Sequence, residues 1–352
     1  MAWLMLAAGL ALLVLGSEWL VNGAARLAAD FGVPSLIIGL TIVAFGTSAP
    51  ELAVSVKSAW SGQTELAVAN VVGSNIFNVL FILGLAALIS PLLVSPQLVR
   101  RDVPLMIGAS ALAMLLLRDG ALARWEAAVL FAGVILYTLF LFREGRKQGA
   151  DEPDLELVDT HVPTWRNVAL MAGGLALLVL GSRWLVESAI EIASSFGVSE
   201  AVIGLTIVAA GTSLPEVMTS IMATIKGQRD IAIGNVVGSN LFNILCVLGL
   251  SGLVAPTPLL AGSQMAQLDI PVMFAIAVLC LPMFFAGGRL SRIDGLVFLA
   301  LYVAYVAYLI ALATAAGYLE TLQTVLVSGL IPAVILYVGW TVARDIPRRK
   351  AL

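Results

Sequence analysis

The sequence predicts an all-α integral membrane protein, built from two inverted repeats of five transmembrane helices and an extra C-terminal transmembrane helix. Composition, the length of the apolar runs and an internal duplication together predict this fold. Hydrophobic residues make up 60% of the 352 residues, and charged residues only 12%. The mean hydropathy is +1.02. Soluble domains carry about 25% charged residues, so this composition indicates a chain that lies in lipid.

Apolar runs near the length that crosses about 30 Å of hydrocarbon recur along the whole chain. No stretch between them is long enough to bury a core of its own, and the first run shows no signal-peptide cleavage site. We therefore expect eleven spans, at residues 3–29, 35–60, 64–89, 102–118, 123–143, 165–194, 199–226, 230–254, 269–286, 292–316 and 320–342.

The chain contains the same pattern twice. LALLVLGSEWLV at residues 10–21 recurs as LALLVLGSRWLV at 175–186, and the same offset of 165 aligns 36–85 with 201–250 at 28 identities in 50 positions. A fixed offset of this size indicates duplication of a whole structural unit. The predicted parts are a first repeat at 1–143, a linker at 144–164, a second repeat at 165–316, and the extra helix with a basic tail at 317–352.

Five spans per repeat force the second copy to enter the membrane from the opposite side, as in many secondary transporters. The basic residues support this topology. With the N-terminus outside, fifteen of the nineteen Lys and Arg residues fall on the inner side, as the positive-inside rule requires. The sequence therefore predicts a multi-pass protein of the cell (inner) membrane, with the linker and the C-terminus in the cytoplasm.

Two short motifs interrupt apolar spans. GTSAPE begins at Gly46 and GTSLPE begins at Gly211. Proline cannot donate to the preceding helical turn, so Pro50 and Pro215 predict breaks near these glycines. Loose carbonyls at membrane depth are tolerated where they line a cavity or are buried in protein. The glutamate after each proline then lies near a helix N-terminus, where the dipole favours a carboxylate.

Polar residues continue from each motif along one helical face. The first copy carries Thr47, Glu51, Ser55 and Ser58, then Asn70, Ser74 and Asn78 on the next span; the second carries Thr212, Glu216 and Ser220, then Asn235, Ser239 and Asn243. All of these offer oxygen ligands, which Ca²⁺ and other hard cations prefer. Inverted copies would bring the two sets face to face at the midplane.

Other polar residues have plainer interpretations. Small residues such as Ser17 and Ser182 commonly serve close helix packing, and we expect Glu18, Arg183, Glu187 and Glu191 to form ion pairs or line a cavity. A carboxylate in mid-span costs about 2.5–3.5 kcal/mol or more and therefore indicates function, as for Glu51 and Glu216. His161 lies in the linker, and Cys246 and Cys280 are expected as core residues, so no soft-metal site is predicted.

GLTIVAFGTSAPE and the GNVVGSN-type helices, duplicated and inverted, resemble the α-repeats of the sodium/calcium exchangers in the cation/Ca²⁺ antiporter superfamily. The resemblance covers residues 1–316 and indicates a short-loop prokaryotic member. It implies that Glu51 and Glu216 are the shared acidic ligands. It further implies ligands at Thr47, Ser48, Thr212 and Ser213, at the carbonyls of Ala44 and Ala209, and at Ser74, Asn78, Ser239 and Asn243.

The resemblance implies exchange of Na⁺ for Ca²⁺ by alternating access, with three Na⁺ per Ca²⁺ and the first and sixth helices as the moving elements. The only ligands it implies are the transported ions, with no cofactor, no nucleic acid and no obligate protein partner. Some members have Asp where this chain has Asn243, so a site with two carboxylates argues against potassium dependence. The eleventh span also departs from the family's ten.

A Ca²⁺/H⁺ antiporter that uses the same glutamates is the nearest alternative, and the abundant hydroxyl and carbonyl oxygens favour Na⁺ over it. An intramembrane enzyme would need a nucleophile–base pair, and neither motif carries a histidine or lysine beside its serine. A non-transporting scaffold would have no need of two carboxylates at helix breaks.

Overall fold

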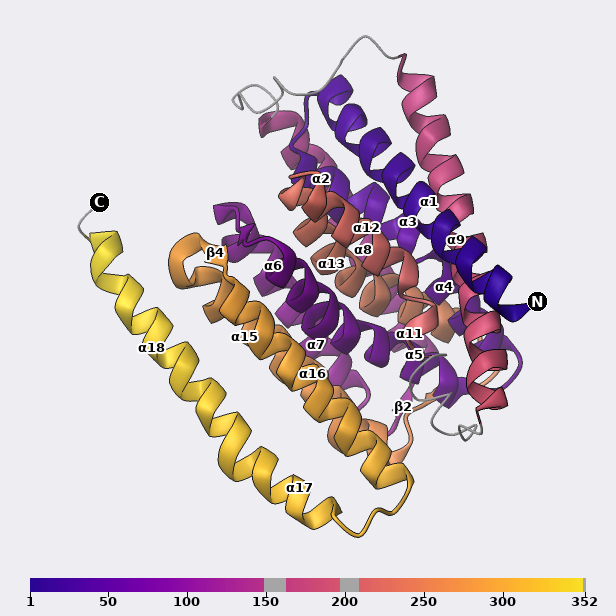
Figure 1. Cartoon of the computed structure of the whole chain (residues 1–352), viewed down its shortest axis with the longest axis vertical. Helices are drawn as coiled ribbons and strands as arrows, with labels where there is room; N and C mark the ends of the chain where they lie inside the picture. The colour runs from indigo at the N-terminus through magenta and orange to yellow at the C-terminus, as the bar shows by residue number, and fades with distance from the viewer. Residues whose placement is uncertain (149–162, 197–208, 351–352) are drawn as a thin grey trace.

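The computed structural model describes residues 1–148, 163–196 and 209–350, which are almost entirely helical (Figure 1). The first half contains α1 (Ala2–Phe31), α2 (Ser35–Ile38), η1 (Gly39–Val43), α3 (Ala44–Thr47), α4 (Ala49–Trp60), α5 (Thr64–Phe77), η2 (Asn78–Leu83), α6 (Gly84–Ile89), η3 (Leu98–Asp102), α7 (Val103–Leu116) and α8 (Arg124–Gln148). The second half contains α9 (Thr164–Ser195), α11 (Ala209–Gly211), α12 (Leu214–Ile225), α13 (Arg229–Phe242), η6 (Asn243–Leu248), α14 (Gly249–Val254), η7 (Met265–Asp269), α15 (Ile270–Phe285), η8 (Ala286–Gly288), α16 (Arg292–Ala313), α17 (Leu319–Val325), η9 (Leu326–Leu330) and α18 (Ile331–Lys350).

These helices follow the predicted spans. In the described part of the chain, eight helices are long and apolar enough to cross a membrane, and Ser35–Thr47 with Ala49–Trp60 forms a further span bent by 46°. The predicted span 102–118 is occupied by α7. Of the predicted span 199–226, residues 199–208 lie outside the described residues, as do linker residues 149–162.

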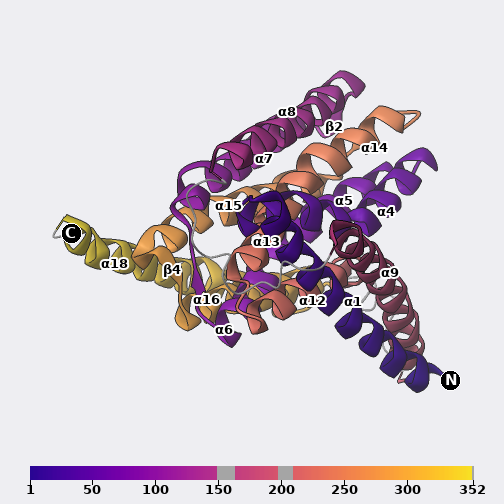
Figure 2. The same cartoon turned by 90° about the horizontal axis from the view of Figure 1, so that it is seen from above.

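α1 and α9, the first helix of each copy, pack against each other in antiparallel directions (Figures 1 and 2). A Cβ on Gly16 would lie 2.7 Å from the Gly174 carbonyl oxygen, and one on Gly181 would lie 2.8 Å from the Gly9 carbonyl oxygen. The offset of 165 makes Gly9 equivalent to Gly174, and Gly16 to Gly181. The contacts are therefore reciprocal, as a two-fold relation between the helices requires.

Two short antiparallel strand pairs join loops of the two copies. β1 (Leu92–Leu93) pairs with β4 (Arg289–Leu290), and β2 (Ala121–Leu122) pairs with β3 (Leu259–Leu260). In the predicted topology the first pair joins two inner loops and the second joins two outer loops. Each strand pair therefore joins two loops that the predicted topology places on the same side of the membrane.

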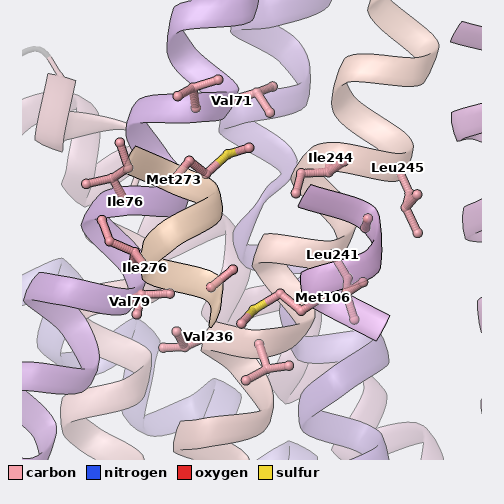
Figure 3. Packing of buried hydrophobic residues seen from close by; sticks show 14 of the residues in the cluster. Val71, Ile76, Val79, Met106, Val236, Leu241, Ile244, Leu245, Met273 and Ile276 are labelled. Carbon is pink, nitrogen blue, oxygen red and sulfur yellow. The ribbon is translucent and has the colours of Figure 1, made fainter. Parts of the chain in front are cut away.

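The centre of the bundle is formed by α5 with η2 and by α13 with η6. In the most apolar stretch of Arg229–Val254, 94% of the residues are buried, against 6% in Leu319–Asp345. Side chains of these central helices interlock with those of α7 and α15, as Val71, Met106, Val236 and Met273 show in Figure 3. α17 and α18 lie at the edge of the bundle, away from α1 and α9 (Figure 2).

A buried carboxyl–tyrosine contact also occurs twice. The Tyr137 hydroxyl donates to Asp102 Oδ1 at 3.3 Å, and the Tyr305 hydroxyl donates to Asp269 Oδ1 at 2.7 Å. Each aspartate precedes the first residue of α7 or α15. The duplication therefore extends to the last helices of both copies, far from the GTS motifs.

We predict that Gly16→Ala destabilises the protein by about 1–3 kcal/mol, because the added methyl group meets backbone atoms that cannot move aside. Thermal unfolding of the purified protein in detergent measures the change. Gly73→Ala is the matched control: a Cβ there meets nothing within 4 Å, and alanine favours the α5 helix. A Gly16→Ala variant as stable as Gly73→Ala would contradict the close α1–α9 contact.

Candidate cation site

Each GTS motif contains a helix break. The break lies at Ser48 (φ −81°, ψ 6°) between α3 and α4, and at Ser213 (φ −87°, ψ 5°) between α11 and α12. These positions are two residues beyond the glycines near which the sequence predicted them. The reason is that proline is tolerated in the first turn of a helix, so the second helix begins one residue before Pro50 and before Pro215.

The two glutamates are completely buried, and each receives a hydrogen bond from the opposite copy. Glu51 and Glu216 are both 0% exposed and lie in the first turns of α4 and α12. Ser48 Oγ donates to Glu216 Oε1 at 2.9 Å, and Ser213 Oγ donates to Glu51 Oε1 at 2.8 Å. The predicted meeting of the two copies at their helix breaks is therefore present in the structure.

An asparagine on each central helix forms hydrogen bonds both to the helix after the break in its own copy and to the threonine at the break of the other copy. Asn70 Nδ2 donates to the Glu51 carbonyl at 3.2 Å and to Ser55 Oγ at 2.9 Å, and Asn70 Oδ1 accepts from Thr212 Oγ1 at 3.4 Å. Asn235 makes the matching bonds to Glu216, Ser220 and Thr47. The polar stripes predicted on one helical face are thus joined into one network.

Asn78 and Asn243, predicted as ligands, are oriented by two asparagines that sequence reasoning missed. Asn78 Nδ2 donates to Asn240 Oδ1 at 3.0 Å, and Asn243 Nδ2 donates to Asn75 Oδ1 at 3.1 Å. Each bond occupies the amide nitrogen and leaves the amide oxygen of Asn78 or Asn243 available. The signal in the sequence was the repetition of Asn75 and Asn240 at equivalent positions of the two GSN motifs.

Several buried oxygens of this network have no hydrogen-bond partner. They are Glu51 Oε2, Glu216 Oε2, Asn78 Oδ1, Asn243 Oδ1 and Ser239 Oγ. Unpaired polar atoms in a low-dielectric interior are costly. Five of the ten such atoms in the described residues belong to side chains that were predicted as ligands, which favours a ligand site here. Because all five are oxygens, the set suits a hard cation. Ser74 differs from its counterpart Ser239, since Ser74 Oγ is 3.1 Å from Ser213 Oγ.

The prolines release carbonyls one turn before themselves, at Gly46 and Gly211. The Gly211 carbonyl accepts from Ser182 Oγ at 2.6 Å. The carbonyl of Ala44, which the resemblance implied as a ligand, accepts the Ser48 amide at 3.0 Å. It lies 3.4 Å from Thr47 Oγ1, whose proton is donated to Asn235 Oδ1 at 3.0 Å. Ala209, its counterpart, is the first residue of α11.

The two copies differ where α1 and α9 meet the rest of the bundle. Ser182 donates to the Gly211 carbonyl at the helix break, whereas its counterpart Ser17 donates to the Val14 carbonyl of its own helix at 2.8 Å. Glu18 pairs with Lys226 at 2.9 Å, and Arg183 pairs with Glu187 at 2.8 Å. Ion pairing is therefore confirmed for Glu18, Arg183 and Glu187, and both pairs are partly exposed and separate from the buried glutamates. Glu191, for which ion pairing or cavity lining was also expected, takes part in none of the salt bridges of the described residues.

Neither buried glutamate has a cationic partner among the described residues, whose three salt bridges all lie elsewhere. No group of three or more His, Cys, Asp and Glu residues suited to a metal ion occurs in that part of the chain either. The charge of the site therefore comes from two carboxylates, and hydroxyl and amide oxygens supply the remaining ligands. Cys246 and Cys280 are buried free thiols in the core.

The family model described as sodium/calcium exchanger protein matches residues 1–143 and 166–311. The chain belongs to the sodium/calcium exchanger family. It is 33% identical to the sodium/calcium exchanger MaX1 of Methanosarcina acetivorans, over 87% of this chain and 98% of that protein. It is 41% identical to the inner membrane protein YrbG of Escherichia coli, over 80% of this chain and 89% of that protein.

The fold is also that of a solved exchanger. Structures of the sodium-calcium exchanger NCX_Mj superpose with a TM-score of 0.75 at 30% sequence identity, covering 89% of this chain and 98% of that one. The protein is therefore a multi-pass membrane protein of a family of transporters, and not an enzyme. The family match ends at residue 311, so α17 and α18 lie beyond it.

We predict that Asn75→Leu weakens Ca²⁺ binding by about tenfold or more, because Asn243 then loses the bond that orients its amide oxygen. The protection that Ca²⁺ gives against thermal unfolding measures the affinity. Asn167→Leu is the control, since Asn167 is equally buried but bonds to Asp30, outside the site. Equal losses in the two variants would contradict a positioning role for Asn75.

Proposed function

We propose that this protein is a secondary active antiporter that exchanges Na⁺ for Ca²⁺ by alternating access. The observation that carries the proposal is the pair of buried glutamates, each bonded to a serine of the opposite copy and each with one unpartnered oxygen. The proposed ligands are Glu51, Glu216, Thr47, Thr212, Ser48, Ser213, Ser74, Ser239, Asn78 and Asn243, with the carbonyls of Ala44 and Ala209.

Charge balance supports Ca²⁺ as one of the cargo ions. Two carboxylates without a basic partner neutralise one divalent cation, and an uncompensated buried charge would be costly. Ca²⁺ takes about six to eight oxygen ligands, which the two copies can supply jointly. Na⁺ ions in overlapping positions would neutralise the same carboxylates. Competition for one set of oxygens then makes exchange obligatory, because the empty, charged site cannot cross.

The names of the relatives support sodium as the partner ion. MaX1 and NCX_Mj are both named as sodium–calcium exchangers, and YrbG is named as an inner membrane protein. We place this protein in the cell membrane with the N-terminus outside, and we propose that inward Na⁺ flow drives Ca²⁺ export. The resemblance implies three Na⁺ per Ca²⁺, of which two would neutralise the two carboxylates and the third would carry the one net charge moved in each cycle, worth about 2.3 kcal/mol per 100 mV.

We propose that α1 and α9 move as one unit during the cycle. Their glycine contacts hold the two helices together, whereas their polar contacts with the rest of the bundle are few and differ between the copies. Ser182 bonds to the break at Gly211, but Ser17 makes no equivalent bond to Gly46. Sliding of α1 and α9 along the bundle would give Ser17 the bond to its helix break and remove that of Ser182. The cation site would then open to the other side of the membrane.

Proton coupling is the second candidate. Each glutamate has one unpartnered oxygen and forms no salt bridge with the described residues, so protonation would also neutralise the site. The same residues could then exchange Ca²⁺ for H⁺. The hydroxyl and amide oxygens around the carboxylates favour Na⁺, since protons need no such coordination shell.

We predict that vesicles loaded with Na⁺ take up ⁴⁵Ca²⁺, and that Glu51→Gln and Glu216→Gln each abolish the uptake. Loading with K⁺ or with acid provides the ionic controls. Asp102→Asn is the matched variant, because it neutralises a carboxyl that is equally buried but lies outside the site. Uptake driven by a proton gradient would select the second candidate, and uptake that persists in both glutamate variants would refute this site.

We predict that Asn243→Asp adds a requirement for a further monovalent cation. A third carboxylate leaves the Ca²⁺-loaded site with a net negative charge, and a buried uncompensated charge opposes the crossing step. Uptake of ⁴⁵Ca²⁺ by this variant, measured with and without external K⁺ and across pH, shows the new requirement. Transport that depends only on Na⁺, as in the parent protein, would contradict the charge balance proposed here.

A further inference from the structure

We propose that the seam between the last helix and the bundle binds one anionic phospholipid of the cytoplasmic leaflet. Its acyl chain would occupy an apolar cavity between α15, α16 and α17–α18, and its headgroup would bind Arg289 and Arg344. This proposal concerns a part of the molecule outside the cation site, where α17 and α18, which lie beyond the family match, meet α15 and α16. It does not depend on which ions are exchanged.

α18 is held to the bundle chiefly near one end. The Tyr337 hydroxyl donates to Asp294 Oδ1 at 2.7 Å, and the Gly287 amide donates to Asp345 Oδ2. The rest of the helix lies at the edge of the molecule (Figures 1 and 2), with side chains such as Ile335 and Leu336 largely exposed. Most of its length therefore faces lipid or the space that separates it from α15 and α16.

That space includes an apolar cavity of about 470 Å³. Its lining includes Val272, Ile276, Leu301, Ala304, Leu330 and Val334. Protein interiors are closely packed, and apolar cavities do not retain water. Because the cavity lies between membrane-spanning helices, the apolar material available to fill it is a lipid acyl chain.

A second cavity, of about 300 Å³, is polar and follows directly along α18. The apolar cavity extends to Ile335, and the polar one begins at Tyr337. Arg289 and Arg344 contribute donors to the polar cavity. The hydroxyls of Ser291 and Thr341, which also line it, donate to Asp294 and to the Val338 carbonyl. An apolar space that continues into a polar one, lined by two arginines and two hydrogen-bonded aspartates, matches the two parts of a phospholipid.

The two carboxylates that line the polar cavity take part in bonds that hold the fold. Asp294 Oδ1 accepts from Tyr337, and Asp294 Oδ2 accepts from the backbone and hydroxyl of Ser291, closing the cap of α16. Asp345 accepts from Gly287. The salt bridges of the described residues involve neither Arg289 nor Arg344, so their guanidinium groups suit a phosphate, which arginine binds with paired donors.

The polar cavity also lies at the depth of a headgroup. Arg344 lies over the Trp340 ring, 4.7 Å from its centroid, and Trp340 is exposed; exposed tryptophans mark the membrane interface. Arg348, Arg349 and Lys350 follow in the sequence. This end of the chain is predicted to be cytoplasmic, where clustered basic residues attract anionic lipids. Continuity with an apolar cavity favours a phospholipid over free phosphate.

Native mass spectrometry of the full-length protein, stripped of lipid, tests the proposal with phosphatidylglycerol, phosphatidylethanolamine and inorganic phosphate as separate probes. We expect one tightly retained phosphatidylglycerol, with weaker retention of the other two. Arg289→Gln combined with Arg344→Gln should lower this retention by about tenfold or more. Arg100→Gln combined with Arg143→Gln removes two exposed charges from the same side, away from the seam, and should leave retention unchanged.

A second pair of variants tests the acyl-chain cavity. Ala304→Trp fills the cavity and should lower retention, whereas Val303→Trp, one residue along α16 and 65% exposed, should not. Equal loss from the two arginine pairs would mean general attraction to a basic surface and would overturn the proposal. Unchanged retention in Ala304→Trp, or phosphate binding as tight as that of phosphatidylglycerol, would overturn it as well.

Discussion

The structure depends on the burial of two carboxylates in a helical bundle that offers them no basic partner among its described residues. Glu51 and Glu216 have no exposed surface, and the serines that donate to them across the copies are neutral. A buried negative charge of this kind is stable only with a cation or a proton beside it. In the proposed antiporter this need for neutralisation couples the two ions, since a site that must be filled before it can move exchanges one ion for another.

The helix breaks make this burial possible. Each proline begins a new helix at membrane depth, and the glutamate that follows lies in its first turn, where backbone amides and the helix dipole favour a carboxylate. The serine at each break then reaches the glutamate of the other copy. Both bonds therefore need the two copies to face each other.

Much of this could be predicted from the sequence, because composition, span length, duplication and the Pro–Glu motifs are local features. The exact positions of the breaks, at Ser48 and Ser213, could not be predicted without the backbone geometry of the turns. The repetition of Asn75 and Asn240 marks these residues in the sequence, but it does not give their bonds to Asn243 and Asn78 of the opposite copies. The unequal bonds of Ser17 and Ser182 could not be predicted either, since similar repeats give no information on their relative position in one conformation. The docking of α18 through Tyr337 and Asp345 also depends on contacts with distant segments.

The most direct test of a shared site is equilibrium binding of ⁴⁵Ca²⁺ to the purified protein during titration with Na⁺. If Na⁺ and Ca²⁺ neutralise the same two carboxylates, Na⁺ displaces all of the bound Ca²⁺, and raising the Ca²⁺ concentration restores binding fully. Ca²⁺ that stays bound at saturating Na⁺ would show that the two ions occupy separate sites, and would contradict exchange by competition for Glu51 and Glu216.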